Sequence, residues 1–181
     1  MDFLQHTIPI ETLIWLFLVV FMLHDFEEII LVEYWIKRNK GKLNKVVPAR
    51  LLSIKDKMEN TSTAQFSVGV AWIFFLLSCI VLYTTHSLAQ GGNFLIFVAA
   101  LNVLFANVFT HVGQAIIVRG YVPGVVTAVL LLLPYALYTY HRLLQEQIDW
   151  NLIGNSLLVS AILVPVIFIG LVIGKKLLPA K

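Results

Sequence analysis

The sequence contains few charged residues and almost no cysteine. Only 13% of its 181 residues are charged, whereas soluble domains carry about 25%. The single cysteine, Cys79, excludes an internal disulfide framework and a zinc site built from several cysteines. Apolar residues make up 59% of the chain, and the mean hydropathy is +0.87. These proportions exclude a soluble enzyme, a disordered chain and a collagen-like fibre, and they indicate an integral membrane protein.

The charge balance does not point to nucleic acid. The net charge of +3 comes from 13 Lys and Arg against 10 Asp and Glu. These cations flank apolar runs and form no nucleic-acid-binding motif, so we expect no nucleic-acid partner. The expected partner is the lipid bilayer, and a substrate reached there would be a lipid or another hydrophobic molecule. The sequence leaves open whether the chain is a monomer or a homo-oligomer.

Five apolar segments are long enough to cross a bilayer, which takes about 20 residues as a helix. They cover approximately residues 8–36, 66–83, 93–118, 121–140 and 152–173. Long apolar runs without two-residue alternation favour helices over barrel strands. The expected fold is therefore all-α, a single domain over residues 1–181 that forms a bundle of five transmembrane helices. Pro134 and Pro165 lie inside the fourth and fifth spans, where we expect them to distort the helix.

The distribution of Lys and Arg predicts the orientation of this bundle. Twelve of the thirteen lie in the connector 37–64, after the third span or after the fifth, and only Arg142 lies on the opposite side. An odd number of spans fits this division. The N-terminus is therefore expected outside and the C-terminus in the cytoplasm.

The first span contains acidic residues that lipid should not tolerate. His24, Asp25, Glu27 and Glu28 lie within five consecutive positions. One charged acid at a helix centre costs about 2.5–3.5 kcal/mol, so three unpaired ones would cost on the order of 8–10 kcal/mol. None of the five spans contains a Lys or Arg. Protonation, a charged histidine, a cation reaching in from a span end, or a bound metal ion would have to neutralise the acids.

Helix geometry predicts which polar residues cooperate. At about 100° per residue, His24, Glu27 and Glu28 share one face of the first span, with Asp25 beside Glu28. Glu28 lies nine residues before Lys37, which is roughly 13 Å along the helix.

The third span carries a second polar stripe, formed by Asn107, Thr110, His111 and Gln114. His111 lies eight residues before Arg119, which is roughly 12 Å along the helix. Because the two stripes have matching depths, we expect them to meet in the cytoplasmic half of the bilayer.

The spacing predicts a metal site. His24 and Glu28 are four residues apart and point to one side of the helix. With His111 they complete a set of two histidines and one carboxylate, the ligand pattern of catalytic zinc with a fourth position left for water. Zinc is favoured, with iron or manganese as alternatives. Glu27 lies where the general base lies in the H-x-x-E-H arrangement, although Glu28 replaces the last histidine here.

The favoured function is thus a metal-dependent, hydrolase-like enzyme acting on a lipid or other membrane-embedded substrate, with Glu27 as the catalytic residue. Asp25, Asn107 and Gln114 are predicted to support the ligands or contact substrate. For Asn107 and Gln114, the alternative is polar contact between membrane helices. His111 has a similar alternative as a hydrogen-bonded interhelical histidine.

Three other functions remain open for the same cluster. The first is a proton- or cation-coupled transporter, which would need polar residues continuing to both faces. The first span is uninterrupted apolar sequence from residue 13 to 23, which argues against such a path. The second is a haem protein with His24 and His111 as axial ligands. The third is a structural subunit in which the cluster only joins helices.

The run His24-Asp25-Phe26-Glu27-Glu28 resembles the signature of the HXXEE family of small, mostly bacterial membrane proteins. Asn107, His111 and the segment 121–124 (Tyr-Val-Pro-Gly) add to the resemblance, which covers most of the chain. The family name describes a motif and supplies no substrate. The resemblance implies that the histidine and both glutamates of the motif act together with His111, as in a metal-dependent enzyme of the bacterial inner membrane.

Overall fold

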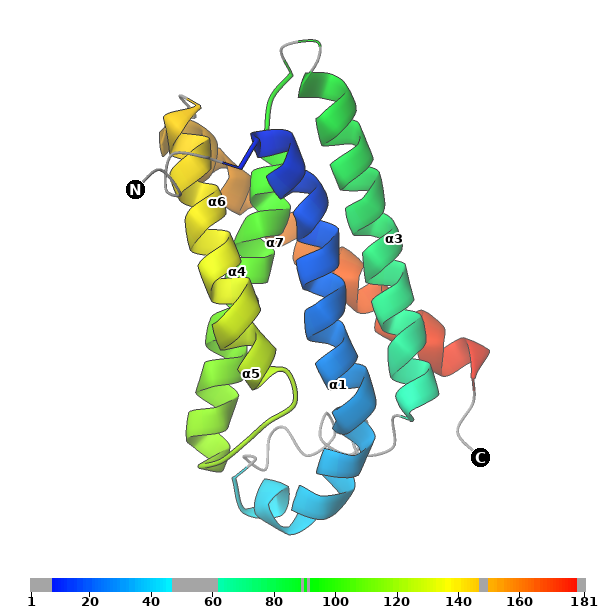
Figure 1. Cartoon of the computed structure of the whole chain (residues 1–181). Coiled ribbons are helices and arrows are strands. Elements are labelled where there is room, and N and C mark those ends of the chain that lie inside the picture. Colours follow the sequence, from blue (N-terminus) through cyan, green and yellow to red (C-terminus); the bar gives the residue numbers. More distant parts are fainter. Residues whose placement is uncertain (1–7, 47–61, 89, 91, 147–149, 179–181) are drawn as a thin grey trace.

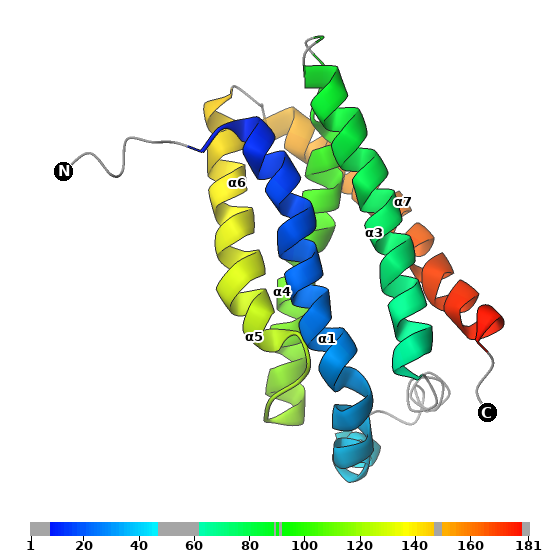
Figure 2. The same cartoon turned by 45° about the vertical axis from the view of Figure 1, so that its right-hand side comes forward.

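The computed structural model of the chain describes residues 8–46, 62–88, 90, 92–146 and 150–178. Within them the elements are α1 (Ile10–Val46), α3 (Thr63–Leu88), α4 (Leu95–Val118), α5 (Val125–Thr127), the π-helix η2 (Ala128–Leu132), α6 (Leu133–Gln145) and α7 (Trp150–Leu177). Helix α1 runs between α3 and α6, and α7 crosses obliquely behind the bundle, against α3 and α4 (Figures 1 and 2). The expected all-α fold is confirmed. Elements α5, η2 and α6 follow one another without a break and together form the fourth helical segment in chain order.

Three of these helices are long and apolar enough to cross a membrane. They are Thr63–Leu88, Leu95–Val118 and Trp150–Gly174. This finding supports an integral membrane protein. Helix α1 has 37 residues, but its acidic cluster and basic C-terminal turns separate it from the other three in composition. The orientation of the bundle across the membrane stays a prediction.

The fourth expected span begins later than predicted. Tyr121 to Gly124 form a loop, and the helix runs from Val125 to Gln145. Gly124 has a φ of 85°, a left-handed conformation that glycine adopts freely and that interrupts a right-handed helix. The connector expected over 37–64 is also shorter, because α1 continues to Val46. Residues 47–61 lie outside the described part.

The π-helix η2 lies directly before Pro134. Proline has no N–H, and its ring clashes with the carbonyl one turn earlier in a regular α-helix. A wider π turn at this point relieves the clash. The distortion expected at Pro134 thus takes the form of a local change in helix type.

The start of α3 is attached to α1 through a carboxylate. Within α3, Ser62 and Gln65 form a reciprocal capping box, with N···O distances of 3.0 and 3.2 Å. Thr63 donates its backbone N–H and its hydroxyl to Oε2 of Glu33, each at 2.9 Å. These contacts fix the separation of α1 and α3 at one end of the bundle.

The apolar core fills the bundle beside the N-terminal half of α1. Its fully buried side chains come from α1, α3, α4, η2 and α6, and include Leu13, Ile14, Phe17, Val81, Phe97, Leu101, Leu132 and Leu143. His24 follows Phe17 two turns along α1 and is itself 2% exposed. The polar cluster therefore begins where the apolar core ends.

Candidate metal centre

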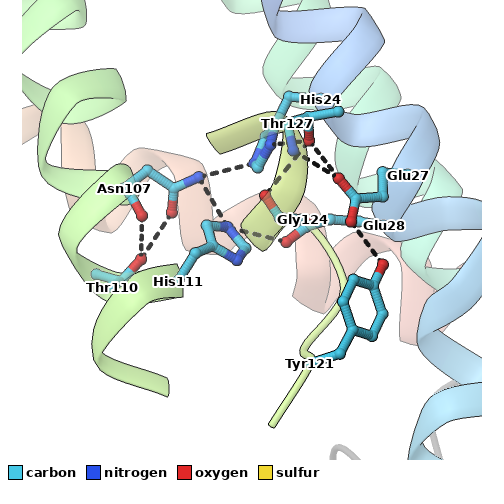
Figure 3. Close-up of polar contacts among 9 residues, drawn as sticks. All are labelled: His24, Glu27, Glu28, Asn107, Thr110, His111, Tyr121, Gly124 and Thr127. Carbon is cyan, nitrogen blue, oxygen red and sulfur yellow. Dashed lines mark hydrogen bonds and ion pairs between the residues drawn. The ribbon is translucent and has the colours of Figure 1, made fainter. Parts of the chain in front are cut away.

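His24, Glu28 and His111 come together between α1 and α4. Each offers one ligand atom, and these atoms lie within 4.8 Å of one another. His111 Nε2 is 3.1 Å from Glu28 Oε1, and the two imidazole rings are nearly perpendicular, with centroids 4.8 Å apart. Both histidines are buried. The polar stripes of the two helices meet, as their matching depths predict (Figure 3).

Asn107 lies between the two histidines. Its Nδ2 is 3.1 Å from His24 Nε2 and 3.2 Å from His111 Nε2. The Thr110 hydroxyl lies 2.7 Å from the Asn107 backbone carbonyl and 3.0 Å from Asn107 Oδ1, and its single hydrogen serves one of these oxygens at a time. An amide nitrogen only donates, so both Nε2 atoms accept from Asn107. His111 Nε2 also faces Glu28 Oε1 at 3.1 Å, and because its lone pair accepts from Asn107 it has no proton to donate to that carboxylate.

The other ring nitrogen of His24 supports the same assignment. His24 Nδ1 is 2.9 Å from Thr127 Oγ1, and the Thr127 hydroxyl donates to Glu27 Oε2 at 2.6 Å. A hydroxyl has one hydrogen, so the ring N–H must be the donor to Thr127. This leaves Nε2 unprotonated. Ligating histidines are commonly oriented by a hydrogen bond from their second nitrogen in this way.

Glu27 attaches α1 to the loop and to α5. Its Oε1 accepts from the Tyr121 hydroxyl at 2.5 Å, and its Oε2 accepts from the backbone N–H of Thr127 at 2.9 Å as well as from the Thr127 hydroxyl. Burial, followed by the hydrogen bond to Glu27, raises the pKa of the Tyr121 phenol above its ordinary value. The phenol thus keeps its proton and remains a donor.

The loop 119–124 turns back into the bundle from the end of α4 to reach α5 (Figure 1). Val122, Pro123 and Gly124 are buried, and Trp35 Nε1 donates to the Tyr121 carbonyl at 2.6 Å. A Cβ on Gly124 would lie 2.6 Å from His111 Cε1 and 2.9 Å from Glu28 Oε1. Only glycine lets the backbone approach the ligands so closely.

A family model described as "Protein of unknown function with HXXEE motif" matches residues 15–139. The chain belongs to the HXXEE family. The motif residues are His24, Glu27 and Glu28, and the matched range also contains Asn107, His111 and the loop 119–124. No curated protein and no solved structure matches the chain.

The HXXEE cluster comprises His24, Glu27, Glu28, Asn107 and His111. Two further residues predicted for the site lie outside it. Asp25 is 5% exposed and faces a cavity that Glu28 and Asn107 also line, and its Oδ2 has no hydrogen-bond partner among the described residues. Gln114 is exposed, one turn beyond His111 on α4, and the structure does not bring it to the cluster.

The sequence did not predict that Thr127 and Tyr121 contact Glu27. The family resemblance singles out the segment 121–124 but assigns no contact to it. Thr127 lies 100 residues from Glu27. A threonine four residues after Pro123 carries no signal of such a contact in a single sequence. Tyr121 was predicted to begin the fourth span.

The donor set of the HXXEE cluster fits a divalent metal ion. Two neutral imidazole nitrogens and one carboxylate oxygen are ligands of the kind that zinc takes, at about 2.0–2.2 Å from the ion. The ligand atoms would need to close together slightly, and the Asn107 amide would have to leave the space between the histidines. Among the described residues, neither Glu27 nor Glu28 forms an ion pair with a lysine or arginine. No described basic side chain therefore neutralises these two carboxylates.

Proposed function

We propose that this HXXEE-family protein is a metal-dependent intramembrane enzyme, hydrolase-like, that acts on a lipid or other membrane-embedded substrate. The convergence of the ligand atoms of His24, Glu28 and His111 within 4.8 Å supports it most directly. Zinc is the favoured ion because two imidazoles and one carboxylate leave an open position, as in catalytic zinc sites; iron and manganese are alternatives.

The surrounding side chains have separate tasks in this proposal. A divalent ion would supply Lewis acidity toward a carbonyl or phosphoryl oxygen. Asn107 Nδ2, once displaced from between the histidines by the ion, would donate to a substrate oxygen. Glu27 is the predicted proton carrier, and its Oε1 keeps a lone pair beyond the one that Tyr121 occupies. Thr127 and Tyr121 hold this carboxylate beside the ligands.

The packing around the cluster favours a one-sided site over a transport path. On the N-terminal side of His24, α1 presents buried apolar residues to the bundle, among them Ile14, Phe17 and Phe21. A transporter would need polar groups continuing in that direction. Bis-histidine haem ligation fits less well, because 4.8 Å between the ring centroids of His24 and His111 leaves no room for a porphyrin between them.

Elemental analysis of the purified full-length protein tests the proposal. We expect stoichiometric zinc, iron or manganese in the wild type and none in Glu28→Ala/His111→Ala. The matched control is His86→Ala/His141→Ala, which removes two exposed histidines and should retain the metal. Circular dichroism would confirm that both variants fold. A folded wild-type protein that stays metal-free after incubation with each ion would contradict the proposal and leave the structural role.

A further inference from the structure

A cavity of about 410 Å³ lies between α1, α3, α4 and α7, on the side of α1 that Asp25 faces. Cavities of this size hold small organic ligands. Along α1 its wall runs from Phe17 through Phe21 and Asp25 to Glu28. From Phe17 to Glu28 the helix rises by eleven steps, which is about 16 Å. The cavity is therefore long enough for a substantial length of hydrocarbon chain.

The cavity is apolar over most of its length and polar at one end. Helices α3 and α7 line it with apolar side chains, such as Val70, Leu77 and Leu163. Its polar wall groups are Asp25, Glu28, Asn107 and Thr110. Glu28 and Asn107 belong to the metal centre as well. A molecule in the cavity would thus place its polar end next to the position of the ion.

Asp25 indicates what that polar end carries. Its side chain is buried, and Oδ2 accepts no hydrogen bond from the described residues. A buried carboxylate oxygen without a donor is unfavourable, and a bound molecule that supplies an O–H or N–H removes this cost. Water is a poor occupant for the remainder of the cavity, since apolar walls give it no partners.

We propose that the cavity binds a single-chain amphiphile, with its hydrocarbon tail between α1, α3 and α7 and an O–H or N–H group donating to Asp25 Oδ2. The proposal that an amphiphile binds here is argued from the cavity alone. The further statement that such an amphiphile is the substrate of the metal centre rests on the proposed function. A long-chain alcohol or amide has this chemistry, whereas a plain hydrocarbon lacks the donor.

Photo-cross-linking in lipid nanodiscs tests the proposal. The probes are a long-chain primary alcohol with a diazirine at mid-chain and the matching alkane without the hydroxyl. We expect the alcohol to label cavity residues such as Val70 and Leu104, and an excess of unmodified alcohol to suppress that labelling. The lipid-facing residues Phe75 and Leu130, which are 59% and 66% exposed, report non-specific labelling.

Variants separate the tail site from the polar contact. Val70→Phe narrows the cavity and should lower alcohol labelling inside it, whereas Val172→Phe, at a residue 54% exposed on α7, should leave it unchanged. Asp25→Leu should lower the alcohol's apparent affinity about tenfold, the size expected for one lost hydrogen bond, while Asp25→Asn keeps an acceptor oxygen and most of the affinity. The alcohol–alkane comparison in the wild type needs no variant to fold.

Equal labelling of the cavity by both probes, or labelling confined to lipid-facing residues, would overturn the inference. Its failure is distinguishable from that of the proposed function, because cross-linking is read on metal-free protein and metal content is read without a probe. Metal without cavity labelling would overturn only the amphiphile site. Cavity labelling without metal would support the site and contradict only the enzyme.

Discussion

Thr127 donates both its backbone N–H and its hydroxyl to one carboxylate oxygen of Glu27, at 2.9 and 2.6 Å. The same hydroxyl accepts from His24 Nδ1. Thr127 of α5 thus bridges His24 and Glu27, which both lie on α1. The position of the cluster depends on the loop 119–124 because this loop delivers Thr127 to α1.

Removing the Thr127 hydroxyl should weaken metal binding. Thr127→Val keeps the side-chain shape but leaves His24 Nδ1 without its partner, and loss of such an orienting contact typically costs 10–100-fold in metal affinity. Chelator competition would measure the change. Thr127→Ser keeps the hydroxyl and should behave as the wild type. Equal affinities for the valine and serine variants would contradict the role of this contact.

Gly124→Ala should destabilise the protein and displace the ligands. Its φ of 85° disfavours a side chain, and the added Cβ would meet His111 Cε1 at 2.6 Å. Strained positions of this kind cost about 1–3 kcal/mol. Gly113→Ala is the control. Gly113 lies on the same helix as His111, and a Cβ added there would have no neighbour within 4 Å. Thermal unfolding in detergent should separate the two variants, and equal Tm values would refute the prediction.

Added zinc should raise the thermal stability of the wild type. A ligand that binds only the folded state stabilises it by about 2.7 kcal/mol at a free concentration of about 100 times the Kd. Glu28→Ala/His111→Ala lacks two of the three ligands and should show no zinc-dependent rise in Tm. Calcium, which prefers larger all-oxygen sites, serves as the control ion. A similar zinc shift in both proteins would place zinc binding elsewhere.

Tyr121→Phe should remove a stabilising contact whose contribution to folding stability declines at alkaline pH. The phenol's hydrogen bond to Glu27 is expected to contribute about 0.5–1.5 kcal/mol. Folding raises the Tyr121 pKa, so the folded state keeps a proton that the unfolded chain loses. The stability difference between wild type and variant is therefore full below the ordinary tyrosine pKa of about 10 and declines as the pH rises above it.

Denaturant unfolding at a series of pH values would measure this difference. Tyr83→Phe, at an exposed tyrosine of α3, is the matched control. A wild-type advantage over Tyr121→Phe that grows with alkaline pH would have the wrong sign and would contradict the assignment.

Much of the fold could be predicted from local sequence. Helices α3, α4 and α7 follow long apolar runs, and hydropathy needs no knowledge of neighbours. The start of the fourth span was misplaced because Tyr121 and Val122 have the composition of a membrane helix. The left-handed Gly124 directly precedes the helix and delays its start to Val125, and this conformation has no signature in hydropathy.

The ligand set was also within reach of the sequence. His24 and Glu28 share a face because their spacing is about one helical turn. The depths of Glu28 and His111 match because each lies eight or nine residues before a basic residue at the end of its span. The hydrogen-bond donors to Glu27 were not predictable in this way. Tyr121 and Thr127 reach it across a separation of about 100 residues.

The sequence alone determined that this protein is a helical membrane protein with acids and histidines buried on facing helices, because hydropathy and helical periodicity are properties of neighbouring residues. Only the tertiary structure decided that Glu27 meets Thr127, that Asp25 faces the cavity whose polar end Glu28 also lines, and that Gly124 lies against the ligands. Those relationships arise from how separate helices pack, and a residue's own segment does not specify what another segment places beside it.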